Sequence, residues 1–321
     1  MKAICYHRYG SPDVLQLENV DKPVIDDDGV LVRVHAASVN ALDWHYLRGL
    51  PYIARMSFGL RKPKSHILGA DLAGHVEEVG RNVTGLKPGD EVFGGAGGTF
   101  AEYVSGREHH FAPKPANLTF EQAAAVPIAA TTALQALRDK GQLRPGQKVL
   151  INGAGGGVGS FAVQIAKAFG AEVVAVSGTE NVEMVRSIGA DRVIDHTQED
   201  FTRDGQRYDL ICDIGGNRSL SDCRRALTPE GRLVLVGAGS GRWVGPFLRP
   251  VAGALRSRFI SQRMLPFLAQ QTRDDLLVLK ELIEAGRIVP VIDRAFPLPE
   301  AANAIRYLEA GHVRGKVVVT V

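Results

Sequence analysis

The sequence predicts an α/β protein of two domains, in which a doubly wound parallel sheet is combined with a second domain built mainly from β-strands. The first 120 residues carry short alternating segments separated by Gly and Pro turns. Beyond about residue 123, helices alternate with apolar strands, and a run of glycines separates one such strand from the next helix. A chain of 321 residues also exceeds the usual size of one domain, so two cores are expected.

The N-terminal part, residues 1–122, is expected to form a compact antiparallel β domain. Val30–Ala36 and Asp90–Phe93 alternate between apolar and polar residues, and Lys87–Asp90 contains the Pro-Gly pair typical of a turn. At the other end of the chain, a helix at about 299–310 precedes a strand at 315–321. From the pattern alone, this last strand fits either domain.

The glycine run is the most specific motif. Lys148–Asn152 is typical of a buried strand, and Phe161, Ile165 and Phe169 recur at helical spacing after the turn, before the next apolar strand at 172–176. Ala154-x-Gly156-x-x-Gly159 fits the Rossmann fingerprint with alanine in its first position, and such a turn holds a dinucleotide pyrophosphate at a helix N-terminus. The residues expected to bind the cofactor here are Gly153, Gly156, Gly157, Val158 and Gly159.

The end of the following strand favours NADP over NAD. In NAD-binding proteins an acidic residue about 20 positions beyond the glycines holds the ribose. Here the strand ends in Ser177-Gly-Thr179, whose hydroxyls leave room for a 2′-phosphate and can donate to it, and His196 is the nearest basic candidate with Arg192. Glu180 is an argument for NAD, and an ordinary N-cap is the alternative interpretation of Ser177.

Charge and cysteine content suggest a soluble, cytoplasmic protein. With 38 basic and 35 acidic residues the net charge is +3, so a nucleic-acid partner is not expected. The basic runs at 61–64 and 256–263 are interpreted as solvated loops, with a phosphate-bearing partner as the alternative. Cys5, Cys212 and Cys223 lack paired spacing, as expected of reduced thiols. The N-terminal residues show no secretory signal, and no segment is apolar enough to span a bilayer.

Several ordered motifs together carry a family resemblance. They are Ala37-Ser-Val-Asn-Ala-Leu-Asp43, Leu68-Gly-Ala-Asp-Leu-Ala-Gly74 with Glu77–Gly80, Pro88–Gly94, Gly98–Tyr103, Val126–Leu134 and the glycine turn. On these residues the chain resembles the medium-chain dehydrogenases/reductases, in their zinc-independent, quinone oxidoreductase-like branch, over essentially its whole length. The resemblance implies a GroES-like (chaperonin-10-like) β-barrel domain over 1–122, completed by 290–321, and a Rossmann NADP-binding domain over 123–289. It also places the cofactor in a cleft between these domains.

The zinc ligands of the family's alcohol dehydrogenases are missing. Ala37–Asn40 stands where those enzymes have a Cys, Gly69–Asp71 where they have Gly-His-Glu, and Pro127-Ile128 near their third ligand. The cysteine quartet of a structural zinc site is also absent from the sequence. We therefore expect no metal, and a simple alcohol substrate is disfavoured.

The resemblance implies an NADPH-dependent oxidoreductase that transfers hydride to enones, quinones or related electrophilic carbonyl compounds. It places Asn40 and Thr131 (or Thr132) at the nicotinamide ring. Alternatively, Asn40 is a turn residue that ends a strand, and the threonine serves helix packing or capping. Asp43 is expected to support the pocket, and Tyr46 and Tyr52 to donate to a substrate carbonyl. Trp44 to Phe58 is expected to contribute an apolar wall, and Gly237 and Arg314 further cofactor contacts.

Two other functions stay open at this point. One is a zinc-free, NADP-dependent carbonyl or alcohol dehydrogenase. The other belongs to a different class: a non-catalytic NADPH-binding protein that regulates a partner or binds RNA. A homodimer is expected, because Arg258–Leu265 alternates like an edge strand that can pair subunits, and a monomer is the alternative.

Overall fold

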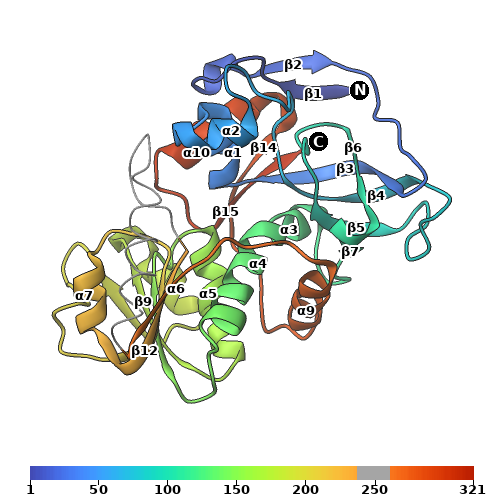
Figure 1. Ribbon diagram of the computed structural model, residues 1–321. Helices are drawn as coiled ribbons and strands as arrows, with labels where there is room; N and C mark the ends of the chain where they lie inside the picture. The colour runs from blue at the N-terminus through green and yellow to red at the C-terminus, as the bar shows by residue number, and fades with distance from the viewer. Residues whose placement is uncertain (237–260) are drawn as a thin grey trace. The chain divides into compact units, whose positions relative to one another are not determined.

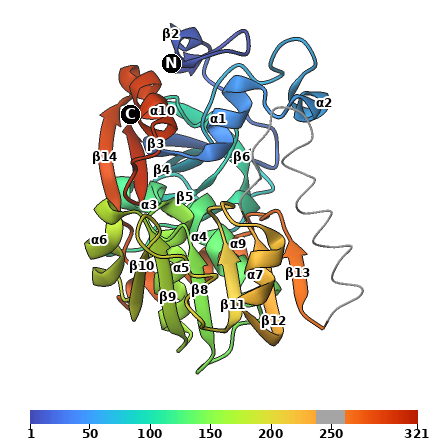
Figure 2. The same cartoon turned by 90° about the vertical axis from the view of Figure 1, so that its left-hand side faces the viewer.

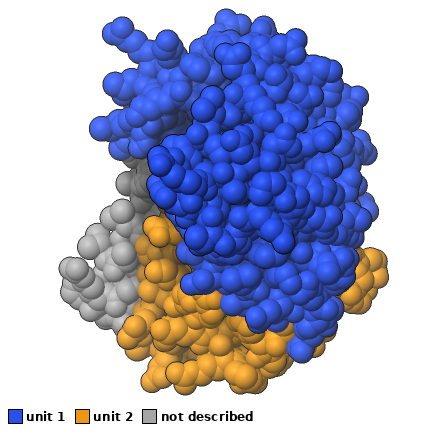
Figure 3. Space-filling view, turned by 90° about the vertical axis from the view of Figure 1, so that its right-hand side faces the viewer, with its two compact units in different colours: residues 1–131, 271–321 blue, residues 132–270 orange. Residues whose placement is uncertain are grey.

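The computed structural model describes residues 1–236 and 261–321 (Figure 1). Their contacts divide the chain into two compact units, residues 1–131 with 271–321 and residues 132–270, which Figure 3 shows in separate colours. Gly237 and the first residues of the expected edge strand lie outside the described residues.

Unit 1 is built on a mixed seven-stranded sheet of order β14-β15-β3-β4-β5-β7, with β6 paired to β3, and a two-stranded sheet β1-β2. Its strands are β1 (Lys2–Cys5), β2 (Gln16–Asn19), β3 (Gly29–Val39), β4 (Asp71–Val79), β5 (Glu91–Gly95), β6 (Tyr103–Arg107), β7 (Phe111–Pro113), β14 (Ile292–Pro297) and β15 (Lys316–Thr320). Its helices are α1 (Ala41–Arg48), α2 (Arg55–Phe58), α3 (Phe120–Ala124), α9 (Arg273–Glu284) and α10 (Ala301–Glu309), and α4 (Pro127–Gln135) begins in it.

The C-terminal strand completes this β unit. β15 pairs antiparallel with β3, so that Val318 lies opposite Ser38, and parallel with β14. β3 is buried along most of its length because it carries β15, β4 and β6 on its edges. Around one end of β3 and β15, Leu47 of α1 and Ile305 of α10 join one apolar core. This packing fixes the start of α1, and with it the polar residues described below.

Unit 2 is a six-stranded parallel sheet of order β10-β9-β8-β11-β12-β13, the strand order of a Rossmann domain (Figure 2). Its strands are β8 (Lys148–Asn152), β9 (Glu172–Ser177), β10 (Arg192–Asp195), β11 (Tyr208–Asp213), β12 (Leu227–Leu235) and β13 (Arg263–Pro266). Its helices are α5 (Gly157–Ala168), α6 (Val182–Ser187) and α7 (Leu220–Arg225), and a π-helical turn follows α4 at Ala136–Lys140. The order reverses between β8 and β11, where ligands bind in such sheets.

Two boundaries differ from those expected. The unit boundaries at 131/132 and 270/271 leave α9 in unit 1, whereas the sequence assigned residues up to 289 to the nucleotide-binding domain. The reason is local contact: Asn117 Nδ2 donates to the carbonyl oxygen of Ile283 over 2.9 Å, and Arg273 pairs with Glu108 over 3.0 Å. α5 begins at Gly157, so the glycine turn leads directly into the helix, as the sequence predicted.

Candidate active site

The glycine turn after β8 has three glycines with three different surroundings. Gly153 has a φ of +92°, which favours glycine. A Cβ on Gly159 would lie 2.1 Å from the carbonyl oxygen of Gly153, so this glycine lets α5 pack against the turn. A Cβ on Gly156 would meet only that same oxygen, at 3.8 Å. Gly156 therefore faces open space, which a side chain would fill.

This open space fits the pyrophosphate of a dinucleotide. Gly156 is the N-cap of the twelve-residue α5 and has no side chain to accept from the first N–H groups of the helix. Free N–H groups and the positive end of the helix dipole favour an anionic group at this position. Gly157, Val158 and Gly159, which form the first turn of α5, lie where the sequence analysis expected them.

A buried polar cluster at the switch point was not anticipated from the sequence. Asn152, the last residue of β8, donates from Nδ2 to Asp213 Oδ1 over 2.7 Å and to Asn217 Oδ1 over 3.0 Å. The Gly216 N–H also donates to Asp213 Oδ1, over 3.0 Å. These contacts fix the loop after β11 next to the glycine turn. In the sequence, this cluster is indicated only by a polar residue at the end of each of two apolar strands, Asn152 and Asp213.

The tip of β9 carries an acidic neighbour that the sequence analysis also missed. β9 and β10 pair so that Ser177 lies opposite Asp195, and the His196 N–H donates to the Ser177 carbonyl oxygen over 3.0 Å. Thr179 Oγ1 donates to Asp195 Oδ2 over 2.6 Å, and this hydrogen bond contributes most to lowering the pKa of Asp195. The hydroxyls of Ser177 and Thr179 and the adjacent His196, which were expected to meet the adenosine ribose, thus lie together with the Asp195 carboxylate, which was not.

In unit 1, Asn40 is held by a buried ion pair. Its Oδ1 accepts from Lys316 Nζ over 2.7 Å, and its Nδ2 donates to Asp71 Oδ2 over 2.9 Å and to the Ser38 carbonyl oxygen over 3.3 Å. Lys316 Nζ lies 3.6 Å from Asp71 Oδ2, with side-chain exposures of 3% and 0%. The amide thus has one orientation.

Burial opposes the charge of both ion-pair partners, and their hydrogen bonds compensate. Desolvation raises the pKa of Asp71 and lowers that of Lys316, while each partner acts against this effect on the other. Asp71 Oδ2 also accepts from Ser38 Oγ over 2.9 Å, and Asp71 Oδ1 accepts from the Ile128 N–H over 3.0 Å. Asp71 therefore ties β3, β4, β15 and the start of α4 together.

Asp43, in the first turn of α1, forms a hydrogen bond to the backbone at the start of this helix. Its Oδ2 accepts from the Asn40 N–H over 2.7 Å, and its Oδ1 is buried without a hydrogen bond. Desolvation raises the pKa of Asp43 to about 7, against the lowering effect of the Asn40 N–H, and the charge of Asp71 raises it further. Asp43 is not among the described residues that line the nearby pocket, and the supporting role expected for it stays a prediction.

Next to α1 lies a pocket of about 540 Å³, within the range of small-molecule sites. Its wall is mostly apolar and backbone, with a few polar side chains. The described residues that line it are Tyr6, Leu42, Tyr46, Ser57, Phe58, Lys64, Ser65, Ile67, Leu68, Gly69, Ala70, Gly95, Ala96, Gly97, Gly98, His110, Ile128 and Gln271.

Two tyrosines line this pocket, and only one of them was expected. Tyr46, on α1, packs its ring against Phe58 at 4.3 Å, and burial, followed by the charge of Asp43, raises its pKa. Tyr6, just after β1, lines the pocket too, and desolvation raises its pKa. Both hydroxyls therefore stay protonated at neutral pH and can donate. Tyr52 is not part of this wall, because its ring lies against the Arg55 guanidinium at 4.8 Å.

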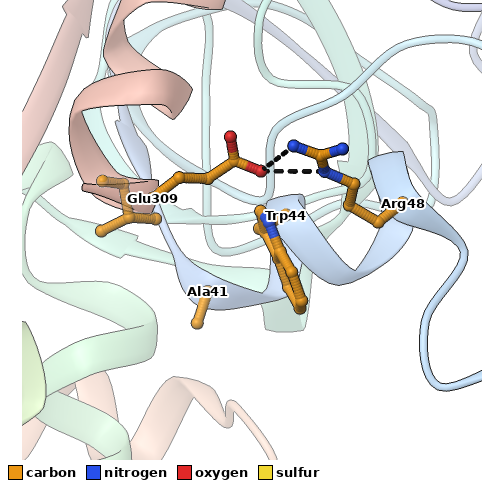
Figure 4. Close-up of a pocket in the computed structure, with 5 residues that line it drawn as sticks. Ala41, Trp44, Arg48 and Glu309 are labelled. Atoms are coloured by element: carbon orange, nitrogen blue, oxygen red, sulfur yellow. Dashed lines mark hydrogen bonds and ion pairs between the residues drawn. The ribbon is translucent and has the colours of Figure 1, made fainter. Parts of the chain in front are cut away.

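The apolar wall expected from residues 44–58 forms only in part. Phe58 lines the pocket, whereas Ile53 and Met56 are exposed. Trp44 instead lines a second, shallower hollow with Ala41, and the Arg48–Glu309 ion pair closes this hollow at 2.7 Å (Figure 4). This pair joins α1 to α10 and neutralises the charge of Arg48.

The remaining expected contacts are placed as follows. Thr131 is 1% exposed, and its hydroxyl has no hydrogen-bond partner, which is unusual for a buried polar group. Arg314 is exposed in the loop before β15, where its N–H donates to Asp293 Oδ2 over 3.1 Å. The roles of Thr131 and Arg314 toward a cofactor stay predictions.

Within residues 1–236 and 261–321, no three His, Cys, Asp or Glu side chains are grouped so that they could hold a metal ion. Cys5, Cys212 and Cys223 are buried, and none of them forms a disulfide bond within the described part of the chain. None of the described helices is long and apolar enough to cross a membrane.

Comparisons with known proteins agree with this architecture. Residues 26–116 match the family model for the alcohol dehydrogenase GroES-like domain, and residues 188–319 match that for zinc-binding dehydrogenases. The chain is 35% identical to 2-methylene-furan-3-one reductase of Solanum lycopersicum and 36% identical to the chloroplastic NADPH-dependent alkenal/one oxidoreductase of Arabidopsis thaliana. Each alignment covers 99% of this chain and 79% of the relative.

Among solved structures, the quinone oxidoreductase of Coxiella burnetii superposes with a TM-score of 0.89 at 32% identity, covering 100% of this chain and 99% of that one. The fold and site define an NAD(P)-binding oxidoreductase. The chain belongs to the medium-chain dehydrogenase/reductase superfamily, in its quinone oxidoreductase-like branch.

Proposed function

We propose that the protein is a zinc-independent, NADPH-dependent reductase of enones, quinones or related electrophilic carbonyl compounds. The observation that carries this proposal is the pocket of unit 1, which is mainly apolar and carries two protonated tyrosine hydroxyls. The names of the relatives support the same chemistry, since they include an enone reductase and an alkenal/one reductase.

The reaction needs a hydrogen-bond donor more than it needs a metal. NADPH, when bound, would supply the hydride that the β-carbon of the enone accepts, and a proton from solvent would complete the reduction at the α-carbon. Negative charge then develops on the carbonyl oxygen of the substrate, and a hydroxyl aimed at that oxygen stabilises it. Tyr46 and Tyr6 are the donors in the pocket, and the apolar wall excludes water while holding the substrate in place.

Zinc independence rests on the residues that replace the expected ligands. Asn40 belongs to the stretch that replaces the cysteine ligand, and Ala70 stands in place of the histidine. Asn40 and the adjacent Asp71 are engaged with Lys316 and with each other, and the Ile128 N–H near the third position donates to Asp71. This closed network leaves no set of thiolate and imidazole ligands that a catalytic zinc ion prefers.

The preference for NADPH over NADH is part of the proposal. In the structure the Thr179 hydroxyl donates to Asp195 Oδ2 and the Ser177 hydroxyl to the Gly178 carbonyl oxygen, and both would have to turn to meet a 2′-phosphate. These hydroxyls and the His196 ring favour NADPH, whereas the Asp195 carboxylate opposes a 2′-phosphate, so the expected preference is modest.

The test is oxidation of NADPH and of NADH, followed by absorbance, with a panel of quinones, alkenals and cyclic enones and with a metal chelator present. We expect chelator-resistant turnover that is faster with NADPH. Activity that the chelator abolishes would refute zinc independence. Reversible turnover of secondary alcohols in place of enones would favour a carbonyl or alcohol dehydrogenase, and binding of NADPH without any turnover would favour a non-catalytic protein.

We also propose that two chains pair through the edge of the parallel sheet. Within the described residues, β13 is bonded to β12 on one side and is the last strand on that side of the sheet. Light scattering behind size-exclusion chromatography distinguishes the dimer from the monomer. The cytoplasmic location expected from the sequence stays a prediction.

A further inference from the structure

The pocket of unit 1 has an uneven charge. Residues 44–70 contain no Asp or Glu but five Lys and Arg residues, and one third of this run lines the pocket. The described lining residues outside the run include no carboxylate either. A small-molecule site that lacks any acidic group tolerates, and can select, a negative charge on its ligand.

The basic residues of this run differ in what they bind. Arg48 is paired with Glu309, and Arg55 donates to the Gly49 carbonyl oxygen over 2.9 Å while packing on the Tyr9 ring. Arg61, Lys62 and Lys64 are exposed and form no ion pair with any described residue.

Lys64 is the one Lys or Arg among the described lining residues of the pocket. It is fixed there by its backbone, because its N–H donates to the Phe58 carbonyl oxygen over 2.8 Å. Ser57 and Ser65 line the same side, and His110 lines the pocket with its pKa lowered by desolvation, so it adds no charge at neutral pH. Among the described lining residues, the positive charge at neutral pH therefore comes from Lys64.

We propose that this pocket selects electrophiles that carry a carboxylate, with Lys64 as the specificity-determining residue. The inference rests on the proposed reductase function and names its substrate class. The apolar wall holds the reacting enone, and the ammonium at the rim pairs with the carboxylate at the other end of the molecule. One ammonium, with one charge and three donors, matches a monoanionic carboxylate.

The experiment compares β-acetylacrylate with its methyl ester, two acceptors of similar size of which only the first carries a charge. The steady-state kcat/KM of each is measured with wild-type protein and with Lys64→Gln. Intrinsic differences in electrophilicity cancel, because each compound is compared with itself. We expect kcat/KM for β-acetylacrylate to fall about three- to tenfold and that for the ester to stay within about twofold.

Two further variants test whether position and charge cause the effect. Lys62 belongs to the same loop but does not line the pocket. Lys62→Gln should therefore leave the ratio of kcat/KM for β-acetylacrylate to kcat/KM for the ester unchanged. Lys64→Arg keeps the charge and should retain most of the preference for β-acetylacrylate. Since both side chains are exposed, none of these variants removes a buried contact.

The outcomes separate this inference from the proposed function. Turnover of both compounds with equal losses in Lys64→Gln, or an equal effect of Lys62→Gln, would overturn the carboxylate selectivity and leave the reductase function standing. If the wild-type protein reduces neither compound nor any member of the enone and quinone panel, the proposed function itself fails.

Discussion

The buried pair of Lys316 and Asp71 gives the sharpest test of how unit 1 is stabilised. Its nitrogen–oxygen distance is 3.6 Å, and both side chains are almost fully buried. The Lys316→Met substitution would leave the Asp71 carboxylate without a counter-charge and remove the 2.7 Å donor of Asn40 Oδ1. Breaking a buried pair on one side costs about 3–5 kcal/mol, so we expect a loss of that size in the free energy of unfolding of unit 1.

An exposed pair in the same unit supplies the control. Lys22 and Glu77 lie closer, at 2.9 Å, but their side chains are 42% and 38% exposed. Water screens such pairs, and Lys22→Met should therefore cost less than about 1 kcal/mol. If distance alone decided stability, this shorter pair would matter more. The comparison thus isolates the effect of burial.

The double variant Lys316→Met with Asp71→Asn tests the coupling. In the absence of the Lys316 ammonium, the Asn40 side-chain amide can rotate so that its oxygen accepts a hydrogen bond from the new Asn side chain at position 71. We expect the double variant to be more stable than the sum of the single losses by about 1.5–3 kcal/mol.

The measurement is urea-induced unfolding at neutral pH, followed by circular dichroism and supported by calorimetry. If the two units unfold in separate transitions, only the transition of unit 1 should shift. A loss in Lys316→Met no larger than that in Lys22→Met, or strictly additive losses in the double variant, would refute the argument from burial.

Three other predictions follow from the site. The pKa of Asp43 is raised to about 7 in the folded protein, so between about pH 4 and 7 the folded state binds a proton that the unfolded state releases. The free energy of unfolding should therefore fall by up to about 4 kcal/mol as the pH rises over this range. In thermal melts, Asp43→Asn should reduce this pH dependence, and the exposed control Asp28→Asn should keep it. Gly156→Ala should leave the melting temperature unchanged and weaken NADPH binding at least about tenfold, whereas Gly159→Ala should lower the melting temperature as well; equal melting temperatures would contradict this contrast. Asp195→Asn should raise the ratio of NADPH to NADH affinity about three- to tenfold by titration, and an unchanged ratio would show that this carboxylate does not face the ribose.

The Rossmann-type unit was predictable because its signals are local. The apolar strand, the glycine turn and the following helix are consecutive in the chain, and each glycine has a reason within a few residues of itself, as the contact between Gly159 and Gly153 shows. Asp195 was missed because its importance depends on the pairing of β10 with β9, which brings it opposite Ser177. The pairing of two residues that lie 18 positions apart cannot be inferred from a single sequence.

The pocket of unit 1 was predictable only in part, because its lining comes from distant segments. Tyr46 was found from the motif around α1, but Tyr6, His110 and Gln271 reach the same wall from other parts of the chain. Tyr52 was expected there from its neighbourhood to Tyr46, yet its ring lies against Arg55 instead. Tyr6 lines the pocket in place of Tyr52, because tertiary packing and not proximity in the sequence decides which tyrosine reaches the wall.

This difference between the units bears on how substrates change within the family. The proposed dinucleotide site depends on one short turn in which Gly153 has a positive φ, Gly159 contacts the backbone and Gly156 leaves space open, so substitutions there should disturb folding or cofactor binding. The proposed substrate pocket instead includes exposed loop residues, such as Lys64 and Ser65, and the same unit holds the buried network of Asp71, Asn40 and Lys316. Exposed residues can be exchanged at little cost in stability. We therefore expect specificity to vary through the acid-free segment between Asp43 and Asp71, while the buried network stays the same.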